Sequence, residues 1–133
     1  MIIEPLVKWG ITHPKKIFQI DGFGAILSAL LLGVVLVRLE RFFGIPVSTL
    51  YLLAALPCLF ALYDFYCYFR VNEKIGRFLT GIAIANLAYC ALSIGLAIYH
   101  RSVITYLGWI YILGEIGIVS ILAILELKVA KHH

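Results

Sequence analysis

Four long stretches of apolar residues dominate the chain, and short polar segments separate them. The stretches cover residues 17–37, 47–69, 78–99 and 103–125. An α-helix needs about 20 apolar residues to cross a hydrocarbon core about 30 Å thick, and each stretch meets that length. Each is a continuous apolar run, whereas a membrane β-strand alternates over about 10 residues. The pattern therefore predicts an all-α integral membrane protein with four transmembrane helices.

The segments between the predicted helices are short, at residues 38–46, 70–77 and 100–102. Short connections make successive helices antiparallel neighbours. We therefore expect an up-down antiparallel four-transmembrane-helix bundle, with residues 1–133 forming a single membrane domain. Pro5, Gly10 and Pro14 interrupt the segment before the first stretch, so no helix is predicted there.

Composition supports the membrane assignment and excludes other classes of protein. The chain is 63% hydrophobic and 14% charged. Soluble domains are about 45–50% apolar and about 25% charged. A soluble globular domain and an intrinsically disordered chain are both excluded by this difference.

The distribution of basic residues predicts the orientation of the bundle. Of the 11 Lys and Arg residues, eight lie before the first helix, in the second connection, or after the fourth helix. They are Lys8, Lys15, Lys16, Arg70, Lys74, Arg77, Lys128 and Lys131. The positive-inside rule then places both ends of the chain in the cytoplasm, in a multi-pass protein of the cell membrane. The net charge of +4 fits the anionic headgroups of a lipid bilayer, so no nucleic-acid partner is expected.

Polar residues inside the predicted helices are the main candidates for function, because such residues are costly within a membrane. Each lies in the half of the bilayer nearer the cytoplasm or at its inner edge, counting about 1.5 Å per residue along a helix. Spacings of three and four residues place a tyrosine on the same helical face as Asn86 and another on the face of Glu115. We expect these residues to line a polar, ligand-binding cavity: Asp21, Asp64, Asn86, Tyr89, Tyr111 and Glu115.

Several of these residues also have a structural interpretation. Asp21, which precedes Gly22, could cap the first helix. Asp64 could pair with an arginine of the second connection, and Asn86 could tie two helices together by a hydrogen bond. Glu115 has no basic residue at its depth, so a functional role is favoured for it. An unpaired carboxyl loses its hydration there, and we expect Glu115 to be protonated at neutral pH.

The sequence predicts no cofactor and no metal site. The three cysteines form no Cys-x-x-Cys pair and are expected to act as small hydrophobic residues. The histidines lie at or beyond the ends of the predicted helices, which leaves no pair to ligate a haem. The chain has no Gly-rich phosphate loop, no zinc-protease motif and no serine-nucleophile motif.

Small residues along the helices predict where helices approach closely. Ala25, Ala29 and Gly33 recur on the first helix, and Gly114 and Gly117 lie on the fourth. We expect these residues to pack inside the bundle. The alternative is contact with a second copy of the chain, in a homodimer.

Three function classes remain, and the first is favoured. The protein could bind or transport a cation, a proton or a small amphiphile, using Glu115, Asp64 and Asn86. It could instead be an accessory or scaffold subunit without a ligand, or a lipid-modifying enzyme at the cytoplasmic interface built on Asp21 and Asp64. The enzyme is the least favoured of the three classes. A bound lipid or small molecule detected by mass spectrometry would separate the three.

Overall fold

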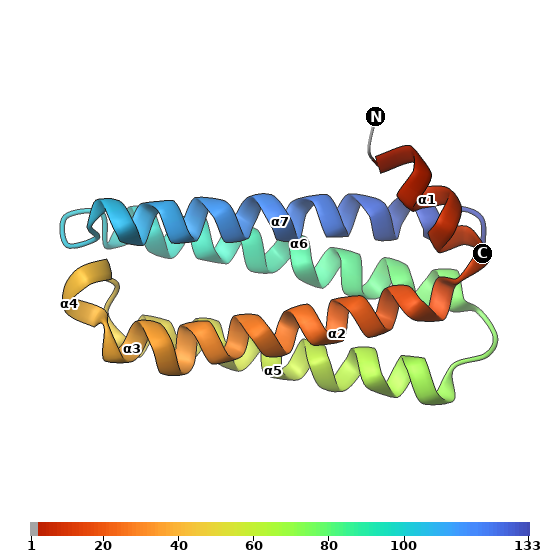
Figure 1. The fold of residues 1–133 in the computed structure, drawn as a ribbon, viewed down its shortest axis with the longest axis horizontal. Helices are drawn as coiled ribbons and strands as arrows, with labels where there is room; N and C mark the ends of the chain where they lie inside the picture. The colour runs from red at the N-terminus through yellow and green to blue at the C-terminus, as the bar shows by residue number, and fades with distance from the viewer. Residues whose placement is uncertain (1–2) are drawn as a thin grey trace.

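The computed structural model describes residues 3–133, and its regular structure in this range is entirely helical. Four helical segments of 24 or 25 residues are long and apolar enough to cross a membrane. The first comprises α2 (Pro14–Leu30), the π-helical turn η1 (Leu31–Val35) and α3 (Leu36–Arg38), and the others are α5 (Val47–Arg70), α6 (Ile75–Tyr99) and α7 (Tyr106–Ala130). The predicted all-α, four-helix membrane bundle is confirmed (Figure 1).

The helices differ from their predicted bounds mainly at the ends. The first begins at Pro14, since proline suits the first position of a helix, where its missing N–H is not needed. The last begins at Tyr106, because the Thr105 side chain accepts a hydrogen bond from the Gly108 backbone N–H. It then continues to Ala130, five residues past the predicted end at residue 125.

A short helix, α1 (Ile3–Thr12), precedes the bundle, so the prediction of no helix there is wrong. Pro5 lies in the first turn of α1, where proline is tolerated. Gly10 allows a close approach to α7, because a Cβ atom there would lie only 2.7 Å from Cγ2 of Val129. Pro5 is therefore compatible with α1, and Gly10 allows α1 to pack against α7.

The bundle consists of two helix pairs, α2 with α5 and α6 with α7, and the contacts within each pair are far more extensive than those between pairs. Figure 1 shows the two pairs one above the other, with both chain ends at one end of the bundle. We call this the terminal end, and it also carries the α5–α6 connection. The opposite, far end carries α4 (Glu40–Phe43) and the α6–α7 connection.

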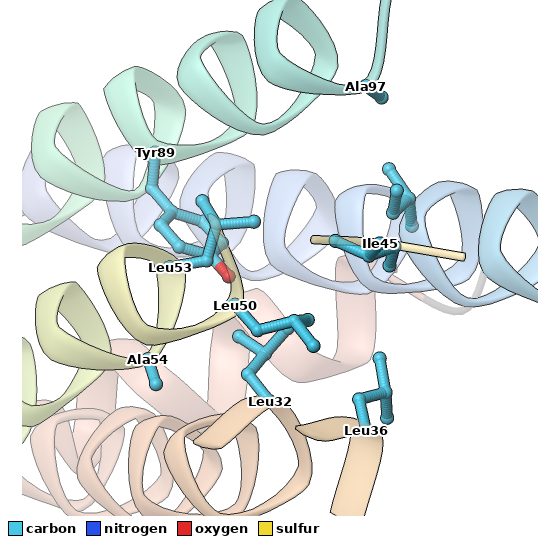
Figure 2. Packing of buried hydrophobic residues seen from close by; sticks show 9 residues of the cluster. Leu32, Leu36, Ile45, Leu50, Leu53, Ala54, Tyr89 and Ala97 are labelled. Carbon is cyan, nitrogen blue, oxygen red and sulfur yellow. The ribbon is translucent and has the colours of Figure 1, made fainter. Parts of the chain in front are cut away.

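Two clusters of buried apolar side chains divide the interior. The far-end cluster, shown in Figure 2, consists of Leu32, Leu36, Ile45, Leu50, Leu53, Ala54, Tyr89, Ala97 and Ile112. The terminal-end cluster consists of Ile17, Phe18, Cys67, Val71, Leu79, Ile82, Leu125 and Val129.

The small residues of the first and fourth transmembrane helices differ in how closely other helices approach them. A Cβ atom at Gly33 would lie 3.2 Å from Cβ of Ala54, so Gly33 packs against α5 as expected. Cβ atoms at Gly114 and Gly117 would meet no atom of the described residues within 4 Å. The expectation that these two glycines pack inside the bundle is therefore wrong.

Candidate functional site

A cavity of about 370 Å³ lies between the two helix pairs. Its wall is mostly apolar, with residues such as Leu31, Pro57 and Phe60. Five of the six predicted site residues line it: Asp21, Asn86, Tyr89, Tyr111 and Glu115. The sixth, Asp64, does not line the cavity. The structure thus brings most of the predicted set together, while their role in binding stays a prediction.

The cavity opens on the side of the bundle, between α2 and α7. Three apolar side chains on its rim are largely exposed: Leu27 at 58%, Ile110 at 67% and Ile118 at 70%. In a bilayer, this surface of the transmembrane helices faces the acyl chains. A molecule dissolved in the bilayer would therefore have a direct path into the cavity.

Glu115 is held on the cavity wall by two tyrosines. The Tyr111 hydroxyl, one turn earlier on α7, donates a hydrogen bond to Oε2 of Glu115 at 2.6 Å. The Tyr89 hydroxyl, from α6, donates to Oε1 of the same carboxyl group. A carboxyl group has about four lone-pair positions, so two such donors leave it able to accept a further hydrogen bond from a ligand.

A second polar group lies at the inner end of the cavity, and each of the four long helices contributes one residue to it. Asp21 of α2, Asp64 of α5, Asn86 of α6 and Glu126 of α7 are between 0% and 4% exposed. Nδ2 of Asn86 donates hydrogen bonds to Oδ2 of Asp21 at 3.0 Å and to Oε1 of Glu126 at 3.1 Å. We call these four residues the carboxyl cluster.

The carboxyl cluster has more acceptor atoms than donors. Both carboxyl oxygens of Asp64 and Oε2 of Glu126 are buried without a hydrogen-bond partner among the described residues. The carboxyls of Asp21 and Glu126 are neighbours, because both accept hydrogen bonds from the same Asn86 nitrogen. Asp64 lies beside Gly22, the residue that follows Asp21, since a Cβ atom at Gly22 would lie 3.3 Å from Cβ of Asp64. Within residues 3–133, no three His, Cys, Asp or Glu side chains are placed to hold a metal ion.

Two structural interpretations from the sequence are wrong. Asp21 lies inside α2, which begins at Pro14, so it does not cap that helix. Asp64 is fully buried and receives no hydrogen bond, so it is not paired with an arginine of the α5–α6 connection. The third interpretation holds, since Asn86 links α6 to α2 and α7 by hydrogen bonds.

Glu126 is the member of the carboxyl cluster that sequence reasoning missed. It lies one residue beyond the predicted end of the fourth helix, where an acidic residue is expected in the headgroup region. Its spacing from Glu115 is the signal that could have identified it. Glu126 follows Glu115 by 11 residues, which is close to three helical turns and places both on one face.

A comparison of the chain with protein-family models, with curated proteins and with solved structures finds no match.

Proposed function

We propose that this protein binds a small amphiphile with a basic head group in the cavity between its two helix pairs. The observation that carries the proposal is an apolar cavity of about 370 Å³, open sideways, with the Glu115 carboxyl held on its wall. Ligand cavities typically have volumes of about 300–1,000 Å³, an apolar lining and a few polar groups that fix orientation.

The chemistry of the wall favours a cationic head group. An ammonium group beside Glu115 favours the ionised carboxylate over the protonated acid expected in its absence. Hydrogen bonds between an ammonium group and a carboxylate are about twice as strong as neutral ones. None of the residues that line the cavity is basic, so a cation there meets no like charge. The mostly apolar wall suits the hydrocarbon tail of the same molecule.

The distribution of charge supports an orientation with the terminal end in the cytoplasm of the cell. Eight of the 11 Lys and Arg residues lie in the segments at this end. Under the positive-inside rule, the carboxyl cluster then lies toward the cytoplasmic leaflet.

The proposal is tested with two probes that differ only in their head groups, decylamine and decanol. Purified protein is incubated with each, and the bound fraction is measured by native mass spectrometry. We expect at least about 10-fold tighter binding of decylamine, since a hydrogen bond to a charged group contributes about 1.5–3 kcal/mol. Glu115→Gln should lower decylamine binding to the level of decanol.

Glu40→Gln is the matched control, because Glu40 is exposed on α4 outside the cavity. It should bind both probes as the wild type does. Equal binding of decylamine and decanol, or equal effects of Glu115→Gln and Glu40→Gln, would refute the proposal.

A second candidate function is that of a subunit that associates through α7. Gly114 and Gly117 present an open surface on this helix, and small residues allow close contact between helices in a membrane. In that case a helix of a second copy would cover the cavity mouth. Gly117→Leu would then convert a dimer into a monomer in analytical ultracentrifugation, whereas Gly95→Leu, an exposed change on α6, would not.

A further inference from the structure

We infer that the carboxyl cluster is an exchangeable proton-binding site at the inner end of the cavity. The inference does not depend on whether the cavity binds an amphiphile. It rests on the placement of Asp21, Asp64 and Glu126, on the single amide that contacts them, and on the apolar side chains around them.

The first step is the balance of donors and acceptors. Ionised carboxyl groups only accept hydrogen bonds, and neighbouring carboxylates cannot both stay ionised without a cation. The Asp21 and Glu126 carboxyls accept from the same Asn86 nitrogen, and Asp64 lies beside Gly22, next to Asp21 in the chain. Among the described residues, Asn86 alone donates hydrogen bonds to these acids. A proton on one acid of each contact supplies the missing O–H donor.

The second step is that the described residues around the three acids supply no compensating positive charge. On α5, Tyr63 precedes Asp64 and Cys67 follows it by one turn, and the Tyr63 hydroxyl already donates to the carbonyl oxygen of Phe78 at 2.8 Å. α6 contributes the neutral Asn86, while α2 and α7 contribute the other two acids. From α1, Val7 and Trp9 pack on the neighbouring apolar side chains. No basic side chain of the described chain donates to the acids, so protons are the cations left to neutralise them.

The third step is the route by which protons exchange. The terminal-end cluster lies between the acids and the polar end of the bundle, and residues such as Phe18 and Val129 are fully buried there. On the other side, Asp21 and Asn86 are part of the cavity wall. A proton released by Asp64 or Glu126 therefore leaves by way of Asp21, the acid of the cluster that lines the cavity. A carboxylate left at Glu126 keeps the hydrogen bond from Asn86, and a carboxylate left at Asp64 accepts a hydrogen bond from an acid that stays protonated.

The measurement is infrared difference spectroscopy of the protein in lipid nanodiscs, between about pH 5 and about pH 9. Exposed carboxyl groups titrate near pH 4 and contribute little in this range. Every sample carries Glu115→Gln, which removes the other buried acid and with it the proposed amphiphile contact. We expect the carbonyl band of protonated carboxylic acids to decrease and the carboxylate band to increase as the pH rises. The acid band should shift in D₂O, because the protons exchange.

Asp64→Asn and Glu126→Gln, added singly, should each lower the amplitude of this difference signal by about a third to a half. Each amide replaces a protonated acid of nearly the same shape, so the fold should be retained. Glu73→Gln is the matched control, because Glu73 is exposed in the α5–α6 connection, and it should leave the signal unchanged.

The inference is overturned if the Glu115→Gln protein, the parent of the other variants, shows no titrating carboxylic-acid band in this pH range. It is also overturned if Asp64→Asn and Glu126→Gln fold but keep the full signal. Loss of decylamine binding alone has no bearing on it, because the infrared samples already carry Glu115→Gln.

Discussion

At the scale of the residue, the hydrogen bonds to Glu115 should contribute measurably to stability. Tyr111→Phe removes the hydroxyl that donates to Oε2 and leaves the ring in place. Such a hydrogen bond contributes about 0.5–1.5 kcal/mol, or about 1.5–3 kcal/mol if the carboxyl is charged. We expect a lower free energy of unfolding by about 1 kcal/mol or more, measured by thermal denaturation in detergent.

Tyr106→Phe is the control for this change. Tyr106 begins the same helix but is 89% exposed, so the loss of its hydroxyl should leave the melting temperature unchanged. Similar melting temperatures for the two variants would mean that the contact between Tyr111 and Glu115 adds nothing to stability.

Site residues could be predicted from the sequence where they lie deep in the membrane, because polar side chains are costly there. Asn86 and Glu115 lie deep inside apolar helices, so their side chains had to face the bundle interior or a cavity, as they do. Glu126 lies near a helix end, where an acid is ordinary, and its burial depends on packing by other helices. The isolation of Asp64 from the arginines likewise follows from tertiary packing that no local pattern contains.

At the scale of the element, the far end of the bundle depends on the absence of a side chain at Gly108. A Cβ atom there would lie only 2.2 Å from the carbonyl oxygen of Phe43, which accepts a hydrogen bond from the Thr105 N–H at 3.1 Å. Gly108→Ala must push α7 away from α4. Overpacking of this kind costs about 1–3 kcal/mol, so the melting temperature should fall.

Gly117→Ala on the same helix provides the comparison, because its added methyl group would meet no described atom within 4 Å. Replacing a mid-helix glycine by alanine gains about 0.5–1 kcal/mol in helix propensity. The melting temperature of Gly117→Ala should thus equal or exceed that of the wild type. A Gly108→Ala protein as stable as Gly117→Ala would contradict the close packing of α4 on α7.

The length and number of the transmembrane helices could be predicted from hydrophobicity, whereas α1 and the π-helical turn η1 could not. The four apolar runs identify the spans because the thickness of the bilayer sets their length. α1 was missed because Pro5 and Gly10 disfavour a helix in isolation, and only contact with α7 shows why glycine is suited there. The π-helical turn η1 has no signal in its apolar sequence and borders the cavity at Leu31.

At the scale of the whole molecule, the orientation can be tested by labelling. Single cysteines replace Lys74 and Arg101, which lie in connections at opposite ends of the bundle, in a background without Cys58, Cys67 and Cys90. A membrane-impermeant thiol reagent should label intact cells at position 101 and not at position 74, as the positive-inside rule requires. The reverse pattern would show that the terminal end faces outward.

The two polar sites share a wall, and this predicts that ligand binding and proton binding are linked. Asp21 and Asn86 line the cavity and also belong to the carboxyl cluster. A cation in the cavity stabilises the deprotonated acids, so its binding should release protons. By linkage, its affinity must then rise with pH, by up to about 10-fold per pH unit for each proton released.

Decyltrimethylammonium is a suitable probe for this linkage because its charge does not change with pH. Its affinity, measured by native mass spectrometry, should be about 5-fold or more higher at pH 8 than at pH 6, within the usual range of coupling energies. The double variant Asp64→Asn/Glu126→Gln keeps Glu115 and the cavity wall but removes two of the titrating acids. Its affinity should vary much less with pH. If both proteins show the same pH dependence, the carboxyl cluster is not linked to the cavity, and Glu115 alone accounts for the effect.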